Sequence, residues 1–221
     1  MNEDKIILID KPAGISSFGV VAKVRGKLKA EFGHKVKVGH TGTLDPFATG
    51  LLILLSGKMT KKSADFLKLD KIYEADLRLG FTSTTGDPEG EIIKKDVFLA
   101  PDTNNIKSVL SKFTGAITQT PPKFSAIKIN GRRAYKLARE GKDFEIPSRE
   151  VTIYSIEILS YNYPELKIRV HCSSGTYIRT LAEDIGEALG TGAYLTALRR
   201  LQIGNYNITN AEKLDFSYKI C

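Results

Sequence analysis

Residues 39–50 read GHTGTLDPFATG and lead directly into the apolar segment Leu51–Leu55. Four of these twelve residues are glycine or proline, which favour backbone conformations outside helices and sheets, so the stretch predicts a loop. A buried strand directly after the loop would hold it at the edge of the core, as is typical of functional side chains. Because Pro46 biases the backbone of Asp45 away from the helical region, we expect the Asp45 carboxylate to point away from the backbone of the loop.

The same loop has a purely structural interpretation. An Asp before Pro often closes a turn with its own side chain, and Thr-Gly pairs often do nothing more than turn. For an isolated Asp-Pro pair this structural role is the more common one. It is the whole twelve-residue pattern that indicates a functional site.

Composition restricts the class of protein. The chain has 221 residues, of which 42% are hydrophobic, so it can bury a core. Its longest apolar run, Leu51–Leu55, has the length of a strand, and the acidic start MNEDKIILID does not resemble a secretory signal. The two cysteines, Cys172 and Cys221, show neither metal-ligand spacing nor a disulfide framework. We expect a cytoplasmic protein without structural zinc and without membrane spans.

Basic residues predict a negatively charged partner. Lys and Arg number 33 against 25 Asp and Glu, a net charge of +8. Basic residues are concentrated in two segments, 21–40 and 128–142, which each contain a single acidic residue, Glu31 and Glu140 respectively. Their cations are Lys23, Arg25, Lys27, Lys29, Lys35 and Lys37, then Lys128, Arg132, Arg133, Lys136, Arg139 and Lys142. Each run could be only a solvated face, but two runs beside turn-rich segments favour a phosphate backbone.

Hydrophobic periodicity predicts a mixed α/β fold. The clearest strand is 71–79, whose alternation turns Tyr73 inward, and the clearest helix starts at Ser16 or Ser17 and ends at Gly33. Further expected strands are 5–9, 36–38, 51–55, 151–159, 165–172 and 203–208. Further expected helices are 61–67, 103–115 capped by Asp102 or Thr103, 132–139, one capped by 173–176 and ending at Gly190, and 193–200. We expect loops at 80–90 and a tight turn at Asn130-Gly131. Strands and helices do not alternate strictly, so a doubly wound sheet is not expected.

Five stretches together resemble the TruB family of tRNA pseudouridine synthases. Besides GHTGTLDPFATG, they are DKPAGISS at 10–17, KIYEADLRLGFTSTTGD at 71–87, QTPPKFSAIKINGRRAYKLAREG at 119–141 and SSGTYIRTLAEDIGEALG at 173–190. The resemblance covers about residues 5–205 in the family's order. It implies a pseudouridine synthase fold, mixed α/β (α+β), with a largely antiparallel central sheet and flanking helices and long loops around an active-site cleft.

The resemblance also implies a domain organisation. A catalytic domain is expected over residues 1–215, with an RNA-gripping insert at 119–150 and a short tail at 216–221. Bacterial members of the family usually carry a C-terminal RNA-binding module of the PUA type, which we do not find in this sequence. We therefore expect weaker tRNA affinity with the chemistry intact.

The implied reaction converts uridine 55 of the tRNA T-loop to pseudouridine. It needs no metal and no cofactor, and the sequence shows no P-loop, no GxGxxG and no metal-spaced cluster. Asp45 would be the catalytic nucleophile, attacking either the uracil ring or the sugar carbon. The expected partner is the tRNA T-stem-loop, bound by a monomer. The family pattern assigns two further catalytic roles: Arg179 lies beside Asp45 as its compensating cation, and Tyr73 stacks on the flipped uracil and helps to remove the ring proton at the new bond site. It also implies three substrate contacts, in which Tyr177 lines the site, Leu198 closes its apolar wall and His40 fills the space left by the flipped base.

Simpler roles remain open for these residues. Arg179 could form only an intrahelical pair with Glu183, four residues on, worth about 0.2–0.5 kcal/mol. Tyr73 and Leu198 could simply pack in the core. Two other functions are also open: a non-catalytic RNA-binding protein, and a carboxylate-dependent hydrolase or phosphotransferase that uses Asp45 with His40. The second would need a metal or a phosphate cradle, for which the sequence gives no signal.

Overall fold

The computed structural model describes residues 3–129 and 131–214, which divide into two compact units. One unit is formed by Met1–Tyr73 with Leu198–Cys221, and the other by Glu74–Ala197. Strands β4 (Lys71–Leu79) and β12 (Ala193–Ile203) contain residues of both. The expected tail at 216–221, Cys221, and Asn130 of the expected turn lie outside the described residues. Within the described residues, no helix has the length and hydropathy needed to cross a membrane.

The first unit is a sheet with helices on both faces. Its strands follow the order β14-β1-β3-β12, with β2 paired to β3 and β13 paired to β12. Strand β3 is antiparallel to β1 and β2 and parallel to β12. The elements are β1 (Ile6–Lys11), α1 (Ser17–Phe32), β2 (Val38–His40), β3 (Thr49–Ser56), the 3-10 helix η1 (Gly57–Lys62), α2 (Ser63–Leu67), β13 (Tyr206–Asn207), the 3-10 helix η2 (Ile208–Asn210) and β14 (Glu212–Lys213).

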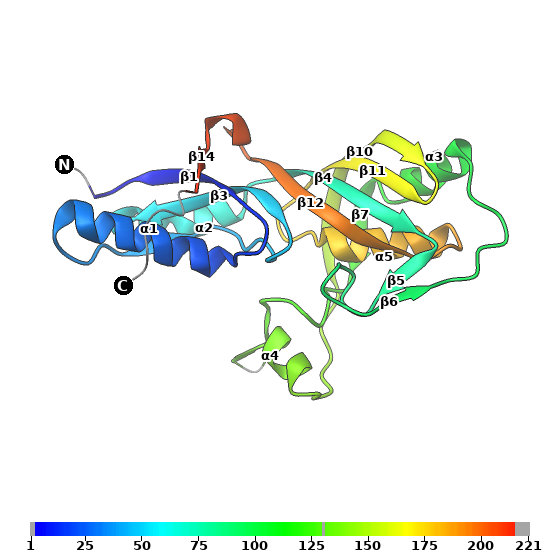
Figure 1. The fold of residues 1–221 in the computed structure, drawn as a ribbon, viewed down its shortest axis with the longest axis horizontal. Helices are drawn as coiled ribbons and strands as arrows, with labels where there is room; N and C mark the ends of the chain where they lie inside the picture. Colours follow the sequence, from blue (N-terminus) through cyan, green and yellow to red (C-terminus); the bar gives the residue numbers. More distant parts are fainter. Residues whose placement is uncertain (1–2, 130, 215–221) are drawn as a thin grey trace. The chain divides into compact units, whose positions relative to one another are not determined.

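Strand β3 lies in the middle of this core. Leu52 and Leu54 pack with the buried side of α1, which Figure 1 shows alongside β1 and β3. Leu51, Ile53 and Leu55 point to the opposite face, where they pack with Phe66 of α2. Because both faces are covered, this strand is apolar without alternation.

Helix α1 forms where its capping residues predict it. The Ser16 side chain accepts a hydrogen bond from the Gly19 N–H at 3.0 Å, and Gly33 closes the helix in the left-handed region with φ of 76°. Val20, Val21, Val24 and Leu28 form its buried side. The prediction for this helix is confirmed.

The second unit is built on a sheet with the strand order β12-β4-β11-β10-β7. The alternation predicted for β4 is confirmed, since Tyr73, Ala75, Leu77 and Leu79 are buried. The ladders β10–β11 and β10–β7 are antiparallel, as the expected largely antiparallel sheet requires. The other elements are β5 (Phe81–Ser83), β6 (Ile92–Lys94), α3 (Thr103–Lys112), β7 (Gly115–Gln119), β8 (Lys128–Ile129), β9 (Arg132–Arg133), α4 (Ala134–Arg139), β10 (Arg149–Asn162), β11 (Glu165–Cys172) and α5 (Ile178–Ala188).

The prediction of a helix at 193–200 is wrong. These residues belong to strand β12, which pairs with β3 through Arg199 opposite Thr49 and Arg200 opposite Gly50. The segment is compatible with a helix locally, and the neighbouring strands decide the outcome because they satisfy its backbone groups. Leu198, expected on that helix, is therefore a buried strand residue.

Several element boundaries also differ from the predictions. Helix α5 begins at Ile178 with Tyr177 as its N-cap residue, so 173–176 does not cap it; the Thr176 hydroxyl instead donates to the Ser173 carbonyl. The expected loop at 80–90 starts with β5, which pairs with β6. The remaining differences are that Arg132–Arg133 form strand β9, that the expected helix at 61–67 is η1 followed by α2, and that the expected strand at 203–208 is the end of β12, β13 and the start of η2.

Candidate active site

Asp45 lies in the loop between β2 and β3, and it is partly exposed. The backbone is tied down on both sides of it. Ser17 Oγ accepts from the Leu44 N–H at 2.8 Å and donates to the Leu44 carbonyl at 2.9 Å. On the other side, the Gly14 N–H donates to the Pro46 carbonyl at 2.9 Å. The residue predicted to be the nucleophile therefore sits on a fixed stretch of irregular backbone.

The side chain of Lys11 holds the same loop from the core. It is fully buried, and its ammonium donates to the carbonyls of Pro12 at 2.9 Å, Ile15 at 2.8 Å and Pro46 at 3.2 Å. An ammonium has three donors, and burying it is costly unless they are used. Lys11 thus joins the DKPAGISS segment to the Asp45 loop.

Arg200 fixes both ends of the loop. Its buried guanidinium donates to the Leu51 carbonyl at 2.8 Å and to the Gly42 carbonyl at 3.1 Å. Gly50 has φ of +103°, and a Cβ there would lie 2.3 Å from the Arg200 carbonyl oxygen. The glycine is therefore needed both for its backbone conformation and for the close approach of β3 to β12.

Three other predicted site residues belong to the same unit as Asp45. His40 ends β2, and its Nδ1 lies 3.4 Å from the Gly42 N–H. Tyr73 in β4 and Leu198 in β12 are 8% and 7% exposed. The inward position of Tyr73 is as predicted, and such burial fits both core packing and the wall of a pocket.

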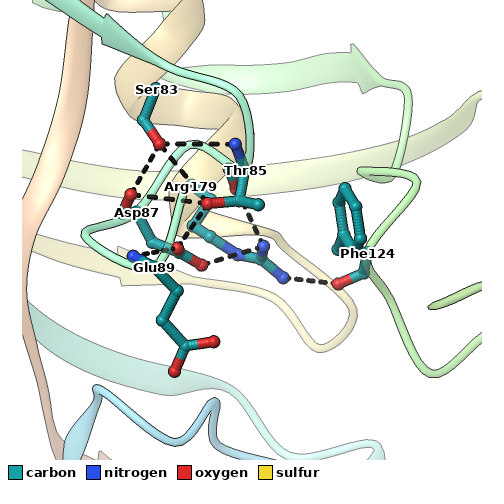
Figure 2. Close-up of polar contacts among 6 residues, drawn as sticks. All are labelled: Ser83, Thr85, Asp87, Glu89, Phe124 and Arg179. Carbon is teal, nitrogen blue, oxygen red and sulfur yellow. Dashed lines mark hydrogen bonds and ion pairs between the residues drawn. The ribbon is translucent and has the colours of Figure 1, made fainter. Parts of the chain in front are cut away.

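Arg179 and Tyr177 belong to the other unit. The Arg179 side chain is only 4% exposed, and it forms an ion pair with Asp87 at 3.1 Å (Figure 2). Its guanidinium also donates to the carbonyls of Thr85 at 2.9 Å and Phe124 at 2.7 Å. A planar guanidinium with several fixed acceptors keeps a single orientation.

Asp87 is the partner that the sequence analysis did not single out. Its Oδ1 accepts from the Thr85 hydroxyl at 2.6 Å and from the Glu89 N–H at 3.0 Å, while Oδ2 faces Arg179. The Ser83 hydroxyl donates to the Asp87 carbonyl at 2.6 Å (Figure 2). Asp87 closes the segment KIYEADLRLGFTSTTGD, so an acidic residue in a Gly- and Thr-rich turn was the available signal.

Glu183, four residues after Arg179, is a partly buried carboxyl within reach of the Arg179 charge. Burial raises the pKa of its carboxyl to about 6, although the Arg179 charge acts in the opposite direction. A Cβ on Gly86 would meet Glu183 Oε1 at 2.7 Å, so this carboxyl packs against the turn that carries Asp87. Arg179 itself forms an ion pair with Asp87 in this unit.

Tyr177 is held by both ends of the insert. The Gln119 side-chain amide accepts from the Tyr177 N–H at 2.9 Å and donates to the Tyr177 carbonyl at 3.0 Å. The Arg149 guanidinium lies 4.8 Å from the centroid of the Tyr177 ring. Gln119 and Arg149 are also paired across β7 and β10. The base of the segment 119–150 is thus attached to the start of α5.

The chemistry available to these residues is that of a carboxylate and a buried guanidinium. Among residues 3–129 and 131–214, no group of three or more His, Cys, Asp and Glu side chains could hold a metal ion.

Family models match most of the chain. One, for the TruB family pseudouridylate synthase (N terminal domain), matches residues 27–178, and another, for the tRNA pseudouridylate synthase B C-terminal domain, matches residues 179–216. The chain is 47% identical over 213 residues to a protein of Cupriavidus pinatubonensis named tRNA pseudouridine synthase B, covering 95% of this chain and 66% of that protein. It is 45% identical over 216 residues to the protein of the same name from Francisella tularensis, covering 97% and 70%. The chain thus spans about two thirds of the length of these relatives.

Solved structures are similar as well. The crystal structure of a Cbf5-Nop10-Gar1 complex contains a chain with a TM-score of 0.70 and 29% sequence identity, over 96% of this chain and 53% of that one. The structure of an H/ACA RNP bound to a substrate RNA containing 2'-deoxyuridine contains one with a TM-score of 0.65 and 28% identity, over 94% and 50%.

Proposed function

Because this chain belongs to the TruB family of pseudouridylate synthases, we propose that it converts uridine to pseudouridine in tRNA, at position 55 of the T-loop. The relatives named tRNA pseudouridine synthase B support tRNA as the substrate. The T-loop position comes from the motif resemblance. With tRNA as its substrate, we place the protein in the cytoplasm, acting as a monomer.

The observation that carries this proposal is the fixed presentation of Asp45. A carboxylate with an ordinary pKa of about 3.9 is ionised near neutral pH and can act as a nucleophile. Hydrogen bonds to Leu44 and Pro46, the residues on either side of Asp45, hold the backbone that carries it. Catalysis of this kind depends on precise positioning of the nucleophile. A loop whose backbone groups were hydrogen-bonded only to water would not provide it.

In the proposed reaction, the glycosidic C–N bond of the target uridine breaks and a C–C bond forms to C5 of the same ring. The C5 proton leaves and the ring nitrogen takes up a proton, so no oxidant or cofactor is consumed. Asp45 would attack either the uracil ring or the sugar carbon. Tyr73 would stack on the flipped base, offsetting part of the few kcal/mol needed to unstack it.

Arg179 is proposed to compensate the Asp45 charge, with Asp87 fixing its orientation. A cation beside a desolvated carboxylate keeps that carboxylate ionised. Tyr177 and Leu198 are proposed to line the base pocket, and His40 to occupy the space that the flipped base leaves in the RNA. The buried ion pair of Arg179 with Asp87 supports a fixed orientation of this guanidinium.

The segment 119–150 is proposed to grip the RNA. It contains the antiparallel strand pair β8 and β9 together with α4, the helix labelled in Figure 1. All six Lys and Arg residues between positions 128 and 142 are exposed, namely Lys128, Arg132, Arg133, Lys136, Arg139 and Lys142. Exposed cations on one short segment suit contacts to phosphates, which supply most of the affinity for nucleic acids.

The test is tritium release from a T-stem-loop minihelix carrying C5-tritiated uridine. We expect the wild-type protein and the matched variant Asp65→Asn, which changes an exposed carboxylate in α2, to release tritium at the same rate. Asp45→Asn should release none, and a minihelix with cytidine in place of the target uridine should yield no pseudouridine. An Asp45→Asn protein that still turned over would refute the assignment. A wild-type protein that bound the minihelix without turnover would instead favour a non-catalytic RNA-binding protein.

A further inference from the structure

A phenylalanine is exposed beside the Asp45 loop. Phe18 lies in the first turn of α1 and is 63% exposed. Its neighbour Ser17 is buried and hydrogen-bonded to both backbone groups of Leu44, the residue before Asp45. The position of Phe18 is therefore fixed close to the loop that carries the proposed nucleophile.

Phe18 is not needed by the core. The buried side of α1 is formed by Val20, Val21, Val24 and Leu28, which pack with strands of the same unit. The other aromatic residue of the helix, Phe32, is partly buried against that cluster. Leaving a large apolar ring in water forgoes the free energy that its burial would supply. The exposure of Phe18 thus has no structural explanation in this unit.

Cations accompany the ring along the same side of the helix. The Arg25 guanidinium lies 5.8 Å from the centroid of the Phe18 ring, and it also donates to the Val38 carbonyl at 3.0 Å. Lys29 is exposed one turn further on. Spacings of 7 and 11 residues from Phe18 put both cations in line with it, over about 16 Å of helix. An aromatic ring is thus followed by two cations in a row that begins at the Asp45 loop.

We propose that Phe18, Arg25 and Lys29 form a contact for single-stranded RNA next to the reacting uridine. The Phe18 ring stacks on a nucleobase that neighbours the flipped uridine, and the two cations bind phosphates of the same strand. This inference rests on the proposed function and extends it to a substrate contact outside the residues assigned above. Flipping a base removes a stacking partner from its neighbour, and an exposed aromatic ring replaces that partner regardless of base identity. The positive charge beside the ring favours RNA over an apolar protein surface.

Equilibrium binding of the T-stem-loop minihelix tests the stacking contact. We expect Phe18→Ala to weaken binding by about tenfold or more, and Phe18→Trp to restore it, because any aromatic face can stack. Tyr154→Ala is the matched control, since Tyr154 is an aromatic residue of the other unit that is 51% exposed. It should bind as the wild type does.

The salt dependence of binding tests the phosphate contacts. Arg25→Gln and Lys29→Gln should each reduce the slope of log affinity against log salt concentration by about 0.7–0.9, and Arg25→Lys should keep it. Lys112→Gln, at an exposed lysine of α3, should leave the slope unchanged.

The outcomes separate this inference from the proposed function. If wild-type protein makes pseudouridine and Phe18→Ala binds RNA as tightly as Tyr154→Ala, the RNA contact is wrong and the function stands. If neither the wild type nor any variant makes pseudouridine but Phe18→Ala loses RNA affinity, the proposed enzymatic function is wrong and the proposed RNA contact stands. Loss of self-association in Phe18→Ala with unchanged RNA affinity would assign the ring to a protein interface and overturn the inference.

Discussion

Replacing Asp87 with asparagine would test how much the buried ion pair contributes. The change keeps the size of the side chain, and its remaining oxygen can still accept from the Thr85 hydroxyl and the Glu89 N–H. It removes the negative charge that Arg179 faces at 3.1 Å and puts an amide donor in its place. Both side chains are about 5% exposed or less, so water cannot take over the lost interaction.

Removing one member of a buried ion pair costs about 3–5 kcal/mol. We expect the lower end, about 3 kcal/mol, because Arg179 still donates to the carbonyls of Thr85 and Phe124. Urea unfolding followed by circular dichroism measures the loss. Glu74→Gln is the matched control, since Glu74 pairs with Arg169 at a similar distance of 2.9 Å but with side chains 22% and 42% exposed. That change should cost no more than about 1 kcal/mol.

A double variant sharpens this test. Combining Asp87→Asn with Arg179→Gln removes both charges of this pair, and we expect it to recover part of the stability that Asp87→Asn loses, because no guanidinium is then buried opposite the neutral Asn side chain. A loss for Asp87→Asn as small as that for Glu74→Gln, or no recovery in the double variant, would refute the reasoning about burial.

Two further predictions concern a glycine and a carboxyl. Gly50→Ala should destabilise the protein by about 2 kcal/mol or more, because its Cβ would lie 2.3 Å from the Arg200 carbonyl at a φ of +103°. Gly26→Ala lies inside α1 with open space around the new Cβ, so it should instead stabilise the protein by about 0.5–1 kcal/mol. Equal changes in stability for the two variants, measured by thermal or urea unfolding, would contradict this prediction. The folded pKa of Glu183 is raised from 4.5 to about 6, so the folded state holds the proton more tightly and stability falls as pH rises between these values. The free energy of unfolding of Glu183→Gln should therefore equal that of the wild type near pH 4.5. Near pH 7.5 it should be about 1 kcal/mol larger than that of the wild type, after allowance for solvent screening. Asp184 is present in both proteins, so its titration contributes equally to both. Urea unfolding at both pH values checks this, and a variant less stable than wild type at the higher pH would contradict the sign.

Local signals determined a large part of this fold. Helix α1 is defined by Ser16 and Gly33, and β4 by the alternation that buries Tyr73. These features depend on properties of each residue and of neighbours a few positions away, such as a side-chain acceptor near a free N–H or a period of two. They can therefore be read from the chain.

The candidate site divides in the same way. The sequence identified Asp45 through its loop motif and placed it before a buried strand, as the structure has it. It did not reveal that Lys11 reaches Pro46, 35 residues away, or that Asp87 faces Arg179 across 92 residues. Such contacts depend on which segments the fold brings together.

The sequence alone thus determined the loop, the buried strand that follows it and the family resemblance, because these are encoded by residues adjacent in the chain. Only the tertiary structure decided that 193–203 is a strand, since its backbone partners in β3 come from residues near Thr49. Only the tertiary structure gave the buried charges their partners. A buried charge needs a hydrogen-bond or ion-pair partner, and a buried backbone N–H or C=O needs a hydrogen-bond partner. In this protein, segments distant in the sequence provide those partners.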